Sequence, residues 1–133
     1  MARSLTPFLM FQKGVAEEAM RFYVSLFEGA TIQRLDRFGA GEAGPHGSVK
    51  HGEIVIAGQV IRCFDSPVPH AFTFTPASSL FVDCQSAEEL DRVFAALADG
   101  GRVLMPVDNY GFSERFGWTD DRFGVSWQLD WSP

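Results

Sequence analysis

The sequence predicts an α+β protein made of two copies of one βαβββ module, whose strands together form a curved, mixed eight-stranded sheet. The main observation is an internal repeat: residues 9–29 align without a gap with residues 80–100, and 7 of the 21 aligned positions are identical. Ordinary residue frequencies give about one or two identities in a segment of this length. Each copy also has the pattern of an apolar strand, an amphipathic helix and three strands, and one copy alone cannot bury both faces of its sheet.

The first copy is predicted to contain a strand, a helix, a strand and a β-hairpin, at residues 6–12, 16–28, 30–38, 48–56 and 59–65. Proline is tolerated near the beginning of a strand, which fits Pro7. The helix has apolar residues at helical spacing and two glutamates in its first turn, and Gly29 is expected to end it. The hairpin is expected to turn at Ala57 and Gly58.

The second copy is predicted to repeat this order, with strands at residues 78–83, 102–107, 112–119 and 125–131. Its helix lies between Ser86 and Gly100, and Ser86 with Glu89 forms a capping-box pattern. Residues 66–76 contain three prolines and no helical period, so they are interpreted as a linker. The chain is therefore expected to be a single domain over residues 1–133, with module one at about 5–65 and module two at about 77–131.

The composition limits the classes of partner. The net charge is −6 and the 11 basic residues are scattered, so no surface for nucleic acid or anionic membranes is expected. No apolar run reaches the roughly 18–20 residues of a membrane span, and no signal peptide pattern is present, so a cytoplasmic protein is expected. Cys63 and Cys84 lie in apolar strands without CxxC spacing and are expected to be reduced, buried thiols.

Several motifs resemble those of one family, and the most specific is Gly-Trp-Thr-Asp-Asp-Arg-Phe-Gly-Val-Ser-Trp-Gln at residues 117–128. The others are Thr6–Leu9 with Phe11, Ala16–Ala19, Phe22-Tyr23, Leu26-Phe27, Val49, His51, Gly58-Gln59 and Asp65. Over nearly its whole length the chain resembles PhnB-like proteins of the vicinal oxygen chelate superfamily, the glyoxalase, bleomycin-resistance and dioxygenase group. The resemblance implies a glyoxalase-like fold, a homodimer and a small-molecule ligand.

The resemblance also implies metal ligands from the first and last strands of each module. The corresponding positions are Thr6, Arg62, Ala77 (or its neighbours Ser78 and Ser79) and Gln128. Only Gln128 is an ordinary metal ligand, and the guanidinium of Arg62 has no acceptor atom. The expectation is therefore a metal-independent protein with no cofactor.

The residues proposed to bind a ligand are Arg62, Gln128, Thr6, Ser79 and His51. In the strand at 59–65, Arg62 shares a face with Val60 and Phe64, where it would favour an anionic or aromatic ligand. Arg62 could instead pair with a carboxylate of its own chain. His51 and Glu53 share a strand face and could form a general-base pair.

Three further features of the sequence have structural interpretations. Residues 39–44 spell GxGxxG, but a proline and a strand follow instead of a helix, so the segment is interpreted as a loop and methyltransferase activity is not expected. Asp120 and Asp121 are expected to shape the turn before Arg122. Trp127 is expected to anchor the helix against the sheet, with Gln128 on the opposite face.

The leading hypothesis is a small-molecule-binding protein whose status as an enzyme is open. The first alternative is a metal-dependent lyase, isomerase or dioxygenase of the same superfamily, with His51, Glu53 and Gln128 as ligands. The second is a dimer with a purely structural role and no ligand. The sequence names no substrate.

Overall fold

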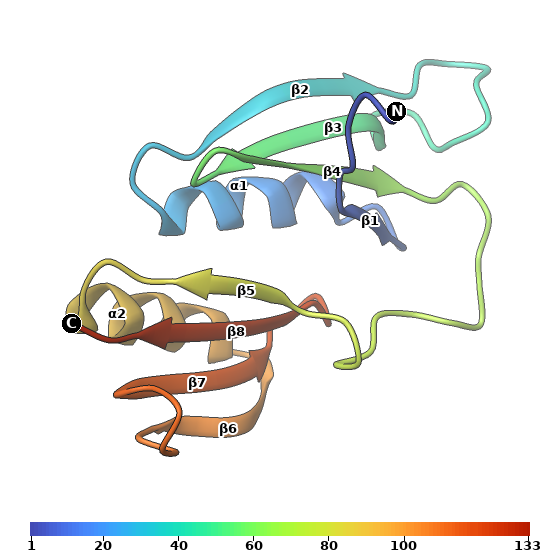
Figure 1. Cartoon of the computed structure of the whole chain (residues 1–133). Coiled ribbons are helices and arrows are strands. Elements are labelled where there is room, and N and C mark those ends of the chain that lie inside the picture. Colours follow the sequence, from blue (N-terminus) through green and yellow to red (C-terminus); the bar gives the residue numbers. More distant parts are fainter. The chain divides into compact units, whose positions relative to one another are not determined.

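A computed structural model describes residues 1–133, which form two compact units, Met1–Ala71 and Phe72–Pro133. Each unit contains one helix and four strands (Figure 1). In the first unit these are β1 (Phe8–Phe11), α1 (Ala16–Leu26), β2 (Thr31–Arg37), β3 (Val49–Ile56) and β4 (Gln59–Asp65). In the second they are β5 (Leu80–Asp83), α2 (Ala87–Ala98), β6 (Arg102–Asp108), β7 (Arg115–Asp120) and β8 (Ser126–Trp131).

The strands of both units are connected in the same way. The first sheet has the order β1-β4-β3-β2 and the second the order β5-β8-β7-β6. In each sheet the first strand is parallel to the last, and the remaining pairs are antiparallel. The prediction of an α+β chain with two βαβββ modules is therefore confirmed. The eight strands are hydrogen-bonded as two four-stranded sheets, however, and not as one continuous sheet.

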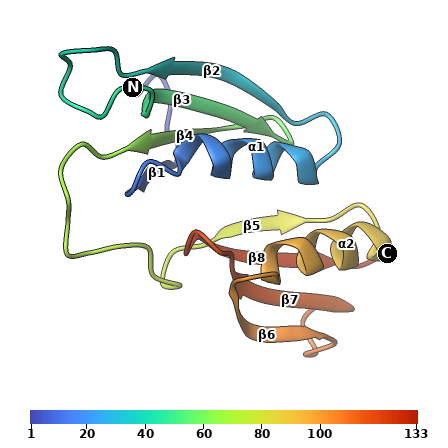
Figure 2. The same ribbon diagram turned by 180° about the vertical axis from the view of Figure 1, so that it is seen from behind.

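A helix covers one face of each sheet, α1 in the first unit and α2 in the second (Figure 1, Figure 2). The buried side chains of α1 and α2 are the apolar stripes read from the sequence, including Tyr23 and Leu26 in α1 and Leu90 and Leu97 in α2. Burying such a stripe against a sheet is the main source of stability for short helices. The opposite face of each sheet is not covered by a helix of its own unit.

Each helix approaches its sheet over a glycine. A Cβ on Gly52 would lie 2.7 Å from Sδ of Met20, and a Cβ on Gly117 would lie 2.7 Å from Cε2 of Phe94. Gly52 and Gly117 occupy corresponding places in β3 and β7 and mark the helix-facing side of each sheet. The alternation of strands then places the residues on either side of each glycine on the other face, which we call the open face.

Most boundaries agree with the sequence within two residues, and β4 agrees at both ends. Gly29 and Gly100 have φ values of 77° and 76°, so they end the helices in the left-handed conformation that was predicted. The larger difference is β7, which begins at Arg115 and not at Phe112. The amide of Gly111 donates to the Asn109 side chain at 2.8 Å, and this local turn precedes the strand.

The strand pairing also changes the alignment of the first strands of the two modules. Phe8 lies opposite Arg62, and Phe81 lies opposite Gln128. Arg62 and Gln128 are thus equivalent, as predicted, but their partners in the first strands are separated by 73 residues and not by the 71 of the sequence alignment. A helix alignment does not fix the register of the strand before it. No helix of the structure is long and apolar enough to cross a membrane.

Candidate functional site

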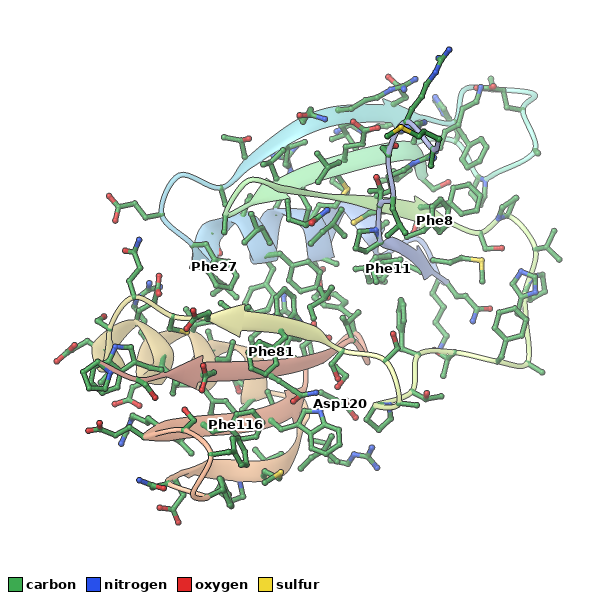
Figure 3. The ribbon with its side chains drawn as sticks, viewed as in Figure 1. Phe8, Phe11, Phe27, Phe81, Phe116 and Asp120 are labelled. Atoms are coloured by element: carbon green, nitrogen blue, oxygen red, sulfur yellow. The ribbon has the colours of Figure 1, made fainter.

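The open face of the first sheet combines aromatic and charged side chains. Phe8 of β1 and Phe64 of β4 contribute rings whose centroids are 5.9 Å apart, and Phe38 adds a third ring 6.4 Å from Phe64. Phe8, which Figure 3 labels, is about half exposed, at 51%. Arg62, His51 and Glu53 lie beside these rings on the same face.

Arg62 is held by weak contacts only. Its Nη2 donates to Nδ1 of His51 at 3.3 Å, and its guanidinium carbon lies 5.3 Å from the centre of the Phe8 ring. Its Nε is buried and has no hydrogen-bond partner. Arg62 makes no ion pair, whereas Arg21, Arg34, Arg37, Arg102 and Arg115 each pair with a carboxylate. The predicted alternative, pairing with a carboxylate such as Glu53, is therefore not found.

His51 is oriented by Glu53 and Gln33. The Nε2 of His51 lies 2.8 Å from Oε2 of Glu53, and Nε2 of Gln33 donates to Oε1 of Glu53 at 2.7 Å. A neutral imidazole with its proton on Nε2 satisfies both of its close contacts, because it donates to Glu53 and accepts from Arg62 at Nδ1. The hydrogen bonds from Gln33 and His51 lower the pKa of Glu53.

Two more charged groups of β2 border this face. Arg34 and Asp36 form an ion pair of 2.7 Å. The Nη1 of Arg34 also lies 3.4 Å from Nε2 of His51, a distance too long for a strong hydrogen bond to a nitrogen that already carries a proton. Arg34 is paired with Asp36, whereas Glu53 is hydrogen-bonded only to Gln33 and His51, so Arg62 is the cation of this face that has no ion pair.

The open face of the second sheet has different chemistry. Trp118 and Gln128 lie opposite each other, at the places that Glu53 and Arg62 occupy in the first unit. The indole of Trp118 donates to Oγ of Ser126 at 2.8 Å, and Oγ of Ser126 lies 2.8 Å from Oγ of Ser79. The side-chain amide group of Gln128 makes no hydrogen bond within the chain.

Aromatic residues extend this second open face (Figure 3). Phe81 and Phe116 have ring centroids 6.5 Å apart, and Phe112 contacts Phe116 edge to face at 4.9 Å. Phe81 is 60% exposed. One carboxylate lies at the end of the face: Oδ2 of Asp120 accepts from Arg102 at 3.0 Å, while its Oδ1 is buried without a partner.

The five residues predicted to bind a ligand therefore fall in both units. Arg62 and His51 are in contact in the first unit, whereas Ser79 and Gln128 belong to the open face of the second. Thr6 precedes β1, and the residue opposite Arg62 is Phe8. No pattern in the sequence identified Phe8, Gln33 or Ser126 as site residues, although the position of Phe8 on the Arg62 side of β1 follows once the strand register is known.

The residues at the expected metal positions do not fit a divalent cation. The guanidinium of Arg62 occupies the position in β4, and a fixed positive charge opposes a second cation. His51 is 3.3 Å from that guanidinium and already bonded to Glu53. No group of three His, Cys, Asp or Glu side chains is arranged to hold a metal ion.

Other predicted roles are structural. Oδ1 of Asp121 accepts hydrogen bonds from the amides of Phe123 and Val125, and Oδ2 accepts from the indole of Trp127 at 2.9 Å, which confirms that Asp121 shapes the turn. Trp127 is buried on the helix side. Cys63 and Cys84 are free and buried, and burial raises the pKa of each thiol to about 12, so both are unreactive.

Comparison with known proteins identifies the fold. A fosfomycin resistance protein, FosX from Listeria monocytogenes, matches with a TM-score of 0.65 at 14% identity over 98% of this chain and 93% of its own. A PhnB protein from Bacillus cereus matches with a TM-score of 0.94 at 48% identity over 98% of this chain and 100% of its own. The fold is therefore that of the vicinal oxygen chelate, or glyoxalase-like, superfamily.

The family is narrower than the superfamily. A family model described as 3-demethylubiquinone-9 3-methyltransferase matches residues 3–130, and the chain belongs to this family. Protein YjdN of Escherichia coli is 26% identical over 95% of this chain and 93% of its own length. The resemblance to PhnB-like proteins stated from the closing motif is thus confirmed.

Proposed function

We propose that the protein binds a small organic anion without a metal ion, and that Arg62 is the residue that binds the anionic group. The observation that carries this proposal is the guanidinium of Arg62, which is half-buried and has no ion pair in the chain. A partly desolvated guanidinium without a direct ion pair is costly, and a carboxylate, phosphate or phosphonate that forms two parallel hydrogen bonds with arginine would lower this cost.

The surroundings of Arg62 favour a ligand that also has an apolar or aromatic part. Phe8 and Phe64 lie next to the guanidinium, and Phe8 leaves half of its surface exposed. A ring stacked on Phe8 would cover that surface while its acidic group reached Arg62. His51, Thr6, Ser79 and Gln128 remain the other proposed ligand contacts.

The family description does not lead us to propose methyl transfer. The GxGxxG segment, residues 39–44, is a loop between β2 and β3, and no helix follows it. A loop that binds a nucleotide-like methyl donor needs such a helix, because its N-terminus supplies the amides and the dipole. The homodimer and the cytoplasmic location are also part of the proposal.

A metal-dependent lyase, isomerase or dioxygenase is the alternative, and one observation favours it: His51 and Glu53 lie side by side, 2.8 Å apart, as two metal ligands could. The positive charge of Arg62 beside His51 counts against it. Titration with Mn²⁺ decides between them, since the alternative requires tight binding that is lost in His51→Gln and Glu53→Gln.

Calorimetric titration with benzoate, phenylacetate and phenylphosphonate tests the proposed function, with benzyl alcohol as the neutral comparison. We expect the acids to bind and the alcohol not to bind. Arg62→Met should weaken binding at least about tenfold, because it removes a charge-assisted hydrogen bond worth roughly 1.5–3 kcal/mol. The matched control is Arg115→Met, since Arg115 pairs with Asp91 on the helix side. Equal affinity of Arg62→Met and the unaltered protein for every acid would overturn the proposal.

Native mass spectrometry of the gently purified protein complements the titration. A dimer without metal that carries a small acidic adduct is the expected species. A divalent ion in every chain would contradict metal independence, and a monomer would contradict the dimer.

A further inference from the structure

We propose that His51 is a general base that removes a proton from the ligand bound to Arg62, so that the protein catalyses proton exchange or enolisation of an aromatic 2-oxo acid. The inference rests on the proposed binding of an organic anion at Arg62. It is carried by the hydrogen-bonded series Gln33, Glu53, His51, which ends at a nitrogen lone pair facing Arg62.

The neighbours of His51 favour one tautomer of the imidazole. Glu53 accepts from Gln33 through Oε1, which leaves Oε2 for the Nε2–H of His51 at 2.8 Å. Nδ1 is then the acceptor nitrogen. A carboxylate that holds one imidazole nitrogen and leaves the other free is the arrangement by which histidine bases are oriented and their cationic form stabilised.

The only hydrogen bond that occupies Nδ1 is a weak one. Its donor is Nη2 of Arg62 at 3.3 Å, the same group that we propose to bind the anion. A ligand acid that takes up the hydrogen bonds of Arg62 would release Nδ1. Atoms next to the bound acid group would then lie close to a free base, because the guanidinium and Nδ1 are already in contact.

The chemistry of these groups selects the class of substrate. Arg62 can donate to a carboxylate oxygen and to a neighbouring carbonyl oxygen, which is the pattern of a 2-oxo acid. A carbon next to a carbonyl group is acidic enough for an imidazole to deprotonate when the developing oxyanion is stabilised by a cation. The exposed Phe8 ring favours an aromatic group on that carbon.

The step is balanced without a redox partner. The C–H bond at carbon 3 breaks, its proton moves to Nδ1, and its electron pair forms the C2–C3 double bond of the enolate while the negative charge moves to the C2 oxygen beside Arg62. The proton on Nδ1 is replaced by one from solvent, and transfer of that solvent proton to carbon 3 completes an exchange. Transfer of a proton from water to the oxygen releases the enol instead, and the imidazolium then returns its proton to the hydroxide.

The test is the rate at which phenylpyruvate exchanges its carbon-3 protons for deuterium, followed by proton NMR in weakly buffered D₂O. We expect the protein to accelerate exchange above the buffer rate. His51→Gln should lower the accelerated rate by about 100-fold or more, the usual contribution of a general base, while phenylpyruvate still binds. The control is His46→Gln, because His46 is exposed in the loop between β2 and β3.

Glu53 is expected to be a positioning residue and has its own readout. The ¹⁵N shifts of the His51 ring should report a proton on Nε2, and Glu53→Gln should alter this signature and slow exchange without changing the affinity for phenylpyruvate. The proposal that His51 is a general base would be overturned if His51→Gln catalysed exchange as fast as the unaltered protein, or if phenylpyruvate bound but exchanged only at the buffer rate. Either result would leave the proposed function intact. Failure of phenylpyruvate and the three simpler acids to bind would overturn the proposed function itself.

Discussion

The two open sheet faces of this chain belong to copies of one module, yet they carry different chemistry. On the first face Arg62 and Glu53 occupy opposite positions on adjacent strands, and on the second face Gln128 and Trp118 do. Both faces have an exposed phenylalanine on the neighbouring strand. The helix-facing sides remain alike, with a glycine under each helix. The comparison teaches that the buried side of each sheet is similar in the two copies, while the side chains of the open face differ in chemistry.

The helix starts differ in a similar way. In α2 the hydroxyl of Ser86 accepts from the amide of Glu89 at 3.0 Å, within one turn of chain. In α1 the residue before the helix, Val15, makes no side-chain cap, and the amide of Ala16 donates instead to Oδ1 of Asp65 at the end of β4, at 2.9 Å. The start of the helix is therefore capped by a residue distant in sequence in the first unit and by a neighbouring residue in the second.

The largest expected effect comes from breaking that long-range contact. Asp65 is 2% exposed and accepts from the amides of both Ala16 and Val49. Asp65→Ala should lower the free energy of unfolding by about 3 kcal/mol or more, since it leaves two buried amides unsatisfied. Ser86→Ala should cost only about 1 kcal/mol, the usual value of a local cap. Urea denaturation measures both, and equal losses would contradict the distinction.

The second expected effect probes the shared, buried side. Gly117→Ala should destabilise the protein by about 1–3 kcal/mol, because a Cβ there would overlap the Phe94 ring, which cannot bend away. Gly52→Ala should cost less, since Met20 is a flexible side chain. Thermal melts rank the two variants, and a larger loss for Gly52→Ala would show that the neighbouring Cys63 carbonyl, 3.0 Å from the added carbon, decides the outcome.

The third effect compares the open faces. Gln128→Leu should weaken binding of phenylphosphonate by about two- to fivefold, because the side-chain amide can supply a single hydrogen bond but no opposite charge. This loss is smaller than that expected for Arg62→Met. Calorimetry distinguishes the two, and a loss as large as that of Arg62→Met would mean that the amide and the guanidinium contribute equally.

The smallest effect is a pH dependence confined to the first face. Hydrogen bonds from Gln33 and His51 lower the pKa of Glu53 in the folded protein. The group therefore adds stability above its ordinary pKa, and that stability is lost as the pH falls through the lowered value. Urea denaturation between pH 7 and pH 3 should show a slightly flatter decline for Glu53→Gln. A steeper decline in the variant would reverse the assigned sign.

The fold was predictable where the signals are local. The cap at Ser86, the glycine stops and the strand β4 each depend on residues close in sequence, and the structure has them where expected. The cap of Asp65 on α1 could not be read, because its partners are 49 and 16 residues away. The register of β1 could not be read for the same reason, and the structure places Phe8 opposite Arg62.

The candidate site was predictable in part. Alternation along β3 predicted that His51 and Glu53 share a strand face, and alternation along β4 grouped Arg62 with Val60 and Phe64. The structure brings Arg62, His51 and Glu53 together. That Arg62 lacks an ion pair required knowledge of every neighbouring carboxylate, including the pairing of Arg34 with Asp36. The lack of an ion pair at Arg62 depends on how the neighbouring strands are paired. The residue pattern of a single strand does not contain that information.

The long-range hydrogen bond of Asp65 also determines the order in which the two helix caps can form while the chain is synthesised. Because α2 carries its cap within its own first turn, its start can form as soon as those residues leave the ribosome. The start of α1 must wait until β4 has been made, 49 residues later, and a short isolated helix is only marginally stable in the meantime. The earlier half of the chain is therefore the half that depends more on being completed, and a nascent chain that pauses before residue 65 would have no cap for α1.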